Sequence, residues 1–272
     1  MHTTMAVILA RGVGTRMRRV DAEAGVTAEQ SDVANTGVKG MIPTATGAPF
    51  LDYVISGLAD AGIADVCLVI GPEHSMVRDY YSRVVTRRVR IHFAIQQDPI
   101  GTANAVLAAE SFADGNTVIV LNSDNYYPVH TLRGLCDLGT NGVAAFERNA
   151  LVRLGNIDAG RVAKYSLLEI AEDGTLARIV EKPDPAFMQS SNAHAFVGMN
   201  SWSLTPVMFE ACRRVPPSPR GEQELPLAAQ FAIDHMGVRF QVLQYQDGVL
   251  DLSHRADIPA VAAALTGIAP HL

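Results

Sequence analysis

The chain has 272 residues, a length that one large domain with a single hydrophobic core can fill. Its composition, 48% hydrophobic and 18% charged, is that of a globular protein and excludes a disordered one. The net charge of −6 argues against a nucleic-acid partner, because binding a polyanion requires clustered lysine and arginine.

Short β-branched runs alternate with helical patterns along the chain, which is typical of an α/β protein with a mainly parallel sheet. Four runs are almost continuously apolar, at residues 7–10, 66–70, 91–95 and 117–121. Such runs predict strands that are covered on both faces.

A glycine-rich loop with an arginine follows the first predicted strand, where residues 9–17 read LARGVGTRM. Backbone N–H groups in a loop of this kind converge on a phosphate group. Gly12 and Gly14 let the backbone approach a ligand closely, and the Arg16 guanidinium can fork across phosphate oxygens. In isolation, so short a pattern is also compatible with an ordinary tight turn.

Residues 21–37 contain many small or acidic side chains and few apolar ones. Thr27 and Gln30 match a capping box, and Gly37 matches a helix stop, so we expect a short helix here. Two interpretations stay open. The segment is either a mobile lid beside a site or a surface insertion without a mechanistic role.

Two further helices are predicted in the first half of the chain. Apolar side chains recur at helical spacing over residues 51–58, and Gly62 stands where a C-cap belongs. The next helix begins after residues 99–102, with Ala103, Val106 and Leu107 on its inner face.

Beyond Asp124 the alternating pattern loosens. Strands over 161–170 and 176–180 flank a turn at 172–174, which predicts a hairpin. The second half therefore resembles an α+β extension that completes a cleft. One last helix is expected over 256–268, and no hexapeptide β-helix follows it.

The three cysteines, Cys67, Cys136 and Cys212, are widely spaced and form no paired motif. We therefore expect neither a disulfide framework nor a zinc site. The longest apolar run near the N-terminus is too short for a signal peptide or a membrane span, so we expect a cytoplasmic protein.

Six segments, by their order and spacing, resemble the sugar-phosphate nucleotidyltransferases, above all the members that transfer uridylyl or thymidylyl groups: 9–17, 39–43, 47–49, 96–102, 122–125 and 181–183. These enzymes make nucleotide-activated sugars from a nucleoside triphosphate and a sugar 1-phosphate and release pyrophosphate. The resemblance implies a Rossmann-like, three-layer αβα fold with a mixed, mainly parallel sheet and a small α+β sugar-binding extension. It also implies one domain over 1–272, with a nucleotide-binding half over about 1–128 and a sugar-binding, metal-completing half over about 129–272.

The same resemblance gives catalytic roles to three cations. Arg16 and Lys39 would hold the triphosphate, and Lys182 would position the attacking sugar phosphate. No general base is required, because a phosphate monoester oxygen is already ionised at neutral pH. Taken alone, Lys39 is equally a solvated lysine, and Lys182 beside Glu181 a surface ion pair.

Asp124 follows the strand at 117–121, at the sheet edge where α/β proteins bind ligands. A carboxylate there can hold Mg²⁺, although an Asp-Asn pair also forms turns. By resemblance, Asp251 is the second metal ligand. The sequence departs from the family after it, because residues 252–254 read LSH where the family usually has Gly-Thr. His254 either joins the site or is simply packed or solvated.

By resemblance, eight residues bind the nucleotide: Ala10, Arg11, Gly12, Gly14, Thr15, Gln96, Gly101 and Thr102. The Gln96 amide can pair with the N3–H and O4 of uracil or thymine, which favours UTP or dTTP. Arg11 departs from the family, which normally has glycine or alanine there. Its long cationic side chain either reshapes the pocket or pairs with an acidic group.

The predicted sugar-binding residues are Asn125, Gly155, Glu181, Gly198 and Asn200. Trp202 either helps to choose the sugar or fills core space.

These observations predict an Mg²⁺-dependent nucleotidyltransferase that binds a nucleoside triphosphate and a sugar 1-phosphate and has no nucleic-acid or membrane partner. Whether it forms a homo-oligomer stays open. Two alternatives also stay open: a cytidylyltransferase for a non-sugar phosphate, and a non-catalytic sensor of a nucleotide sugar.

Overall fold

The computed structural model describes every residue except 1, 22, 163–164, 182 and 184–194. Its strands are β1 (Met5–Leu9), β2 (Asp65–Ile70), β3 (Arg90–Ile95), β4 (Val118–Asn122), β5 (Asn125–Tyr126), β6 (Gly142–Glu147), β7 (Ser166–Ile170), β8 (Leu176–Val180), β9 (Phe196–Leu204), β10 (Gln241–Tyr245) and β11 (Leu250–Asp251). The α-helices are α1 (Thr15–Arg18), α2 (Ala28–Thr36), α3 (Phe50–Asp60), α4 (Ser75–Tyr81), α5 (Thr102–Ala108), α6 (Glu110–Ala113), α7 (Val129–Leu138), α8 (Arg148–Leu154), α9 (Ala159–Val162), α11 (Val207–Arg214), α12 (Leu225–Met236) and α13 (Asp257–Ala264). A short 3-10 helix, η1, spans Lys39–Met41.

The central sheet has the strand order β10-β6-β9-β4-β1-β2-β3, and the hairpin β7-β8 is attached to β9. Strand β1 runs parallel to β2 and β4, β2 runs parallel to β3, and β6 runs parallel to β10. Strand β9 is antiparallel to each of the three strands with which it pairs, β4, β6 and β7. The sheet is therefore mixed and mainly parallel, as the sequence predicted.

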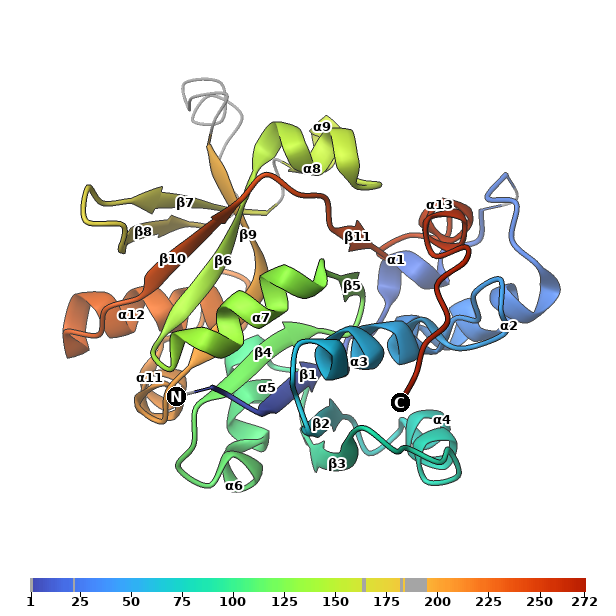
Figure 1. Cartoon of the computed structure of the whole chain (residues 1–272), viewed down its shortest axis with the longest axis horizontal. Coiled ribbons are helices and arrows are strands. Elements are labelled where there is room, and N and C mark those ends of the chain that lie inside the picture. Colours follow the sequence, from blue (N-terminus) through green and yellow to red (C-terminus); the bar gives the residue numbers. More distant parts are fainter. Residues whose placement is uncertain (1, 22, 163–164, 182, 184–194) are drawn as a thin grey trace.

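Helices cover both faces of this sheet (Figure 1). Alternate side chains of β1 divide between two cores, because successive residues of a strand point to opposite faces. Ala6 and Ile8 pack with α3 and α7, whereas Val7 and Leu9 pack with α5, α11 and α12. This arrangement confirms the expected three-layer αβα architecture.

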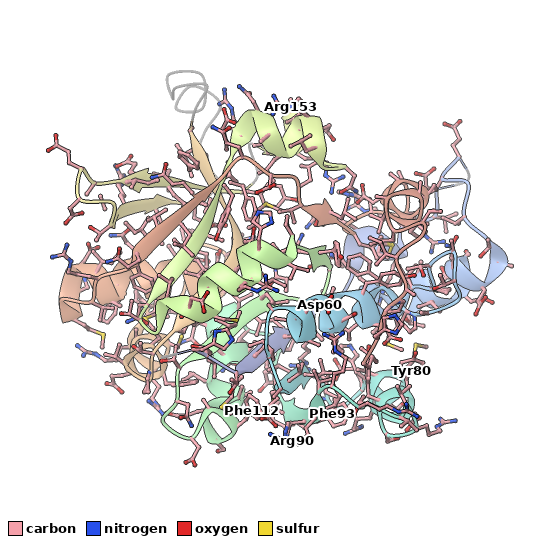
Figure 2. The ribbon with its side chains drawn as sticks, viewed as in Figure 1. Asp60, Tyr80, Arg90, Phe93, Phe112 and Arg153 are labelled. Carbon is pink, nitrogen blue, oxygen red and sulfur yellow. The ribbon has the colours of Figure 1, made fainter. Side chains whose placement is uncertain are left out.

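Strand β3 corrects one expectation. The run 91–95 was expected to be covered on both faces, but β3 is the edge strand of the sheet and most of its side chains are exposed or half-buried. Arg90 and Phe93 lie at the outer margin of the molecule (Figure 2), and the Phe93 side chain is 37% exposed. An apolar run indicates a strand that packs against other elements. It does not show whether the strand is central or lies at the edge of the sheet.

Other bounds also differ from the prediction. Arg161 and Val162 belong to helix α9, so the strand expected over 161–170 begins only at Ser166. Helix α13 ends at Ala264, and the residues up to 267 form a turn, which shortens the helix expected over 256–268. The predicted helix after Thr27 is present with its capping box intact, and Gly62, with a φ of +103°, lies just after the end of α3.

Parallel strands end at the same edge of a sheet, and here β1, β3 and β4 lead into the loops at 10–14, 96–101 and 123–124. The Ser123 N–H donates to the Leu9 carbonyl at 3.1 Å, which holds two of these loops together. No helix among the described residues is long and apolar enough to span a membrane. The three cysteines are buried free thiols.

Candidate active site

A cavity of about 390 Å³ opens at the carboxyl ends of the parallel strands. Its wall is formed by the loops after β1, β3 and β4, by residues 37–41 and by a segment before and at the start of α12. Ten predicted site residues line it: Ala10, Arg11, Gly12, Lys39, Gln96, Gly101, Thr102, Asp124, Glu181 and Asn200.

Other predicted residues lie outside the cavity wall: Gly14, Thr15, Arg16, Asn125, Gly155, Gly198 and Asp251. Arg16 projects from α1 as an exposed side chain. Lys182 lies outside the described residues. Thus the cavity brings together the predicted nucleotide-binding loops, Lys39 and Asp124, whereas most of the predicted sugar-binding residues support the structure around it.

Lys39 and Asp124 form an ion pair inside the cavity. The Lys39 Nζ donates to Asp124 Oδ2 at 2.7 Å, and both side chains are largely buried, with 15% and 19% exposure. Lys39 stands in η1 and Asp124 in the turn after β4, so the pair joins residues 85 positions apart. A buried lysine usually needs a partner, and here the partner is the carboxylate predicted to hold metal.

Asp251 is buried behind Asp124 in a dense polar network. Its Oδ1 accepts hydrogen bonds from Asn125 Nδ2 at 3.1 Å and from Ser253 Oγ at 3.0 Å. Its Oδ2 accepts from Arg161, which also donates to Asp257. Asn125, expected to bind sugar, therefore orients a predicted metal ligand, and Arg161 is a site residue that the sequence reading missed.

The charges around Asp251 show whether the carboxylates of Asp124 and Asp251 suit a divalent cation. Burial raises the pKa of Asp251, and the nearby charge of Asp124 raises it further, against the opposing charges of Arg161 and Lys39. Two close carboxylates that repel each other are hard oxygen ligands of the kind that Mg²⁺ takes together with waters and substrate phosphates. The oxygen atoms of Asp124 and Asp251 therefore fit Mg²⁺. Lys39 and Arg161 compete with the ion for these two carboxylates. Within the described part of the chain, no cluster of three or more His, Cys, Asp or Glu side chains could hold a metal.

His254 does not line the cavity. Its Nδ1 lies 3.5 Å from Asp257 Oδ2, and burial lowers the pKa of His254, while the charges of Arg161 and Arg16 lower it further. The imidazole therefore belongs to the polar network around Asp251 and Asp257 rather than to the cavity wall.

The loop of residues 10–14 packs against the predicted insertion. Gly14 has a φ of +61°, and a Cβ atom there would lie 2.2 Å from the Gly37 carbonyl oxygen. Gly14 is therefore needed for contact with the end of α2 as well as for its own turn. Since Gly37 and Val38 line the cavity, the end of the insertion forms part of the wall of the site.

Gln96 lies at the cavity wall with only 4% of the residue exposed. Its Nε2 donates to the Gly101 carbonyl and to Asn104 Oδ1, both at 3.0 Å. Both N–H groups of the carboxamide are therefore engaged within the protein. Because Gly101 supplies a carbonyl, the nitrogen of Gln96 must face it, and the oxygen is the atom left for a ligand.

The segment 220–226 forms another part of the cavity wall, which was not predicted from the sequence. Gly101 and Thr102 dock it: the Gln223 N–H donates to the Ile100 carbonyl at 2.7 Å, and the Leu225 N–H donates to Thr102 Oγ1 at 2.8 Å. A Cβ atom at Gly101 would lie 2.2 Å from the Gln223 carbonyl oxygen. The charged residues of this segment, one arginine and two glutamates, were the only local signal in the sequence, and they do not show that the segment reaches the β3 loop.

That segment brings charge to the cavity. Arg220 Nη2 lies 2.6 Å from Glu224 Oε1 and 3.6 Å from Glu222 Oε2, and all three residues line the wall. Glu181 lines it as well and accepts a hydrogen bond from Ser166 Oγ. Carboxylates therefore gather at this end of the cavity, where they can accept hydrogen bonds from hydroxyl groups.

The remaining predicted sugar residues have mixed positions. Asn200 lines the cavity with a φ of +56°, a strained backbone for a residue with a side chain. A Cβ atom at Gly155 would lie 2.6 Å from the Val249 carbonyl oxygen, so this glycine permits close backbone packing. Gly198 is buried in β9, against Leu168. Trp202 is buried and makes an edge contact with Phe240, which is the core-filling alternative.

Comparisons with known proteins agree with this arrangement. Residues 5–248 match the family described as Nucleotidyl transferase. The chain is 25% identical over 232 residues to the low-salt glycan biosynthesis nucleotidyltransferase Agl11 of Haloferax volcanii, covering 84% of this chain and 57% of that protein. It is 28% identical over 255 residues to a glucose-1-phosphate thymidylyltransferase of Streptomyces antibioticus, covering 93% and 64%. It thus spans less than two thirds of the length of these two relatives.

A third relative has nearly the length of this chain. The UTP–glucose-1-phosphate uridylyltransferase AglF of Haloferax volcanii is 25% identical over 256 residues, covering 93% of this chain and 92% of that protein. Among solved structures, a UDP-glucose pyrophosphorylase complexed with UDP-glucose superposes with a TM-score of 0.74 at 18% identity, covering 96% and 98% of the two chains. A UTP-bound UGPase from Acinetobacter baumannii also has a TM-score of 0.74, at 16% identity, with coverage of 98% and 95%. These structures establish the fold.

Proposed function

Because the chain belongs to the nucleotidyl transferase family, we propose that it transfers a nucleotidyl group from UTP or dTTP to a sugar 1-phosphate and releases pyrophosphate. The observation that carries the proposal is the Lys39–Asp124 pair, largely buried in a cavity that the predicted nucleotide-binding loops line. The relatives named for uridylyl and thymidylyl transfer to glucose 1-phosphate support this choice of substrates.

In this reaction an oxygen of the sugar phosphate forms a bond to the α-phosphorus of the triphosphate, and the bond from that phosphorus to the pyrophosphate oxygen breaks. Two anionic groups must be brought together, so neutralisation of charge and positioning dominate the catalysis. Lys39 supplies a cation in the cavity, and the loop at 11–13 supplies backbone N–H groups. Arg16 and Lys182 keep the roles that the family resemblance implies.

Asp124 and Asp251 would hold Mg²⁺, which supplies charge neutralisation and fixes phosphate oxygens when it is bound. Without the ion, Lys39 and Arg161 neutralise these two carboxylates. Asn125 and Ser253 hold the Asp251 carboxylate in place from its other side.

Release of pyrophosphate from a panel of nucleoside triphosphates and sugar 1-phosphates, with Mg²⁺, tests the proposal. We expect turnover with UTP or dTTP and glucose 1-phosphate or a related sugar phosphate. Lys39→Met and Asp124→Asn should each lower kcat/KM by about 10²-fold or more, because each removes one member of a charge pair that meets the phosphates. A parent protein that binds nucleotide sugars but releases no pyrophosphate with any pair would instead be a sensor.

A further inference from the structure

The Arg11 side chain is a buried cation whose hydrogen-bonding capacity is largely unused. It lines the cavity, and only 7% of the side chain is exposed. Its Nε and Nη1 are buried and have no hydrogen-bond partner among the described residues. Only Nη2 has acceptors, the two oxygens of the half-exposed Glu73 carboxylate, each at a long 3.4 Å. Buried donors without acceptors cost free energy, which points to an acceptor that a ligand supplies.

The register of the sheet places Arg11 beside Gln96. Strands β1, β2 and β3 are adjacent and parallel (Figure 1), with Leu9 opposite Val69 and Ile70 opposite Ile95. Continuing this register past the strand ends sets Arg11, Gly71 and Gln96 in one row on one face. The Ala10 N–H donates to the Val69 carbonyl and the Gln96 N–H to the Ile70 carbonyl, so the ladder persists to this row.

Gly71 leaves room for the guanidinium. A Cβ atom at Gly71 would lie 2.5 Å from Arg11 Nε. The Arg11 side chain therefore lies over the vacant middle position of the row, and it shares this position with the Glu73 carboxylate. Arg11 and Gln96 thus flank Gly71 in the row, and both line the cavity in which the sequence predicts that the Gln96 carboxamide contacts the nucleobase.

The two side chains offer complementary hydrogen-bonding groups to a base. Both N–H groups of Gln96 Nε2 are engaged with Gly101 and Asn104, so Gln96 offers only its Oε1, an acceptor. Arg11 offers only donors. Together they match a base edge with a ring N–H beside a carbonyl, which uracil and thymine present as N3–H and O4.

We propose that Arg11 is a specificity-determining residue that, together with Gln96, selects nucleotides whose base carries a ring N–H beside a carbonyl oxygen. This inference rests on the proposed function and names the feature of the nucleotide that the site reads. In cytosine, an unprotonated N3 meets the Gln96 oxygen and the 4-amino group meets the Arg11 donors, so both contacts become repulsive. Such mismatched polar contacts discriminate strongly between bases of equal size.

UTP and CTP are the appropriate probes, because they have the same size and charge and differ only at this edge. We expect the parent protein to prefer UTP over CTP by about 10²-fold or more in kcat/KM for pyrophosphate release. Arg11→Met should reduce this preference by about tenfold or more, because it removes the donors but keeps an apolar stem of similar length. Arg213→Met, which removes an exposed arginine paired with Glu110 on another face, is the matched control and should keep the parent preference.

A second variant perturbs Arg11 without removing it. In Gly71→Ala the three atoms nearest to the new Cβ atom belong to the side chains of Glu73 and Arg11, and Gly71 does not have a positive φ, so the fold should tolerate the change. It displaces the guanidinium and should also weaken the UTP preference.

The binding constants of UTP and CTP, measured by calorimetry on the same variants, separate the two proposals. If the parent protein releases no pyrophosphate with any substrate, the proposed function fails, and the ratio of the two constants still tests the role of Arg11. If Arg11→Met raises KM for UTP and CTP by the same factor and leaves their ratio unchanged, Arg11 binds the triphosphate instead and the inference is overturned. An unchanged ratio in Gly71→Ala together with Arg11→Met overturns it as well.

Discussion

At the scale of single residues, the site is a set of charges whose partners lie far away in the chain. Lys39 pairs with Asp124 over 85 positions, and Arg161 pairs with Asp251 over 90. Arg11 reaches Glu73 over 62 positions and leaves two donors unused. The residue types of the predicted site could be chosen from motifs, but motif spacing carries no information on which cation neutralises which carboxylate.

Arg161→Met should lower the free energy of unfolding by about 3 kcal/mol, because it leaves the buried Asp251 and Asp257 without their shared cation. The same change removes the competitor for Asp251, so Mg²⁺ should raise the Tm of the variant more than it raises the Tm of the parent. Thermal melts with and without Mg²⁺ measure both effects. Arg239→Met, which removes an exposed pair with Asp173, serves as the control. An identical response to Mg²⁺ in variant and parent would count against Asp251 as a metal ligand.

Asp52 lies outside the cavity wall, and its burial predicts how the stability of the fold depends on pH. Burial raises the pKa of Asp52, although the hydroxyls of Tyr80 and Tyr81 donate to it at 2.7 and 2.8 Å and oppose the rise. The folded state therefore binds this proton more tightly than the unfolded chain, and the contribution of Asp52 to stability falls as the pH rises through its raised pKa. Asp52→Asn has no such proton, so its stability relative to the parent should increase as the pH rises above about 4, the ordinary pKa of an aspartate. Urea unfolding at several pH values measures this difference, and a decrease would contradict the prediction.

At the scale of elements, the insertion at residues 21–37 separates what a local pattern predicts, the helix itself, from what it does not predict, the place where the helix packs. Thr27 and Gln30 form the predicted capping box, because both hydrogen bonds lie within one helical turn. Where α2 packs is decided by Arg255, which is 3% exposed and lies far along the chain. Its guanidinium donates to the Met17 carbonyl at 2.9 Å, to Ser31 Oγ at 2.9 Å and to Asn35 Oδ1 at 2.5 Å. Arg255 thereby ties α1 and α2 together beside the cavity.

Arg255→Met should destabilise this region by about 2 kcal/mol, because it leaves the buried Met17 carbonyl and the less buried side chains of Ser31 and Asn35 without their shared donor. We expect faster limited proteolysis within residues 21–37 and a lower Tm. The exposed Arg239→Met again provides the control, since its pair with Asp173 is largely solvated. Equal cleavage rates in the parent and both variants would show that α2 is held by other contacts.

At the scale of the whole molecule, the two halves of the sequence share one sheet. Strand β9 from the second half lies between β4 from the first half and β6 from the second. The two cores on either face also draw on both halves. We therefore propose that the chain unfolds as one cooperative domain, in accordance with the sequence prediction of one domain over 1–272.

The three cysteines test this proposal without any substitution. Burial raises the pKa of Cys67, Cys136 and Cys212 to about 12, so their reactive thiolate forms are scarce at neutral pH. Cys67 lies in the first half, and the other two lie in the second. We expect all three to react with a thiol reagent only on global unfolding and at rates that give one common opening free energy. Much faster labelling of Cys67 alone would show that the first half opens independently.

Local patterns were enough to predict the fold class, the family resemblance and ten residues that line the cavity, because apolar periodicity, capping and glycine-rich turns are set by neighbours within a few positions. Four features required the folded structure: the edge position of β3, the contact by which Asn125 orients Asp251, the approach of segment 220–226 to the cavity, and the hydrogen bonds that leave Gln96 an acceptor and Arg11 its donors. These properties depend on side chains that meet across adjacent strands and distant loops. Such contacts arise only when the sheet is assembled, because they join residues that no local pattern links.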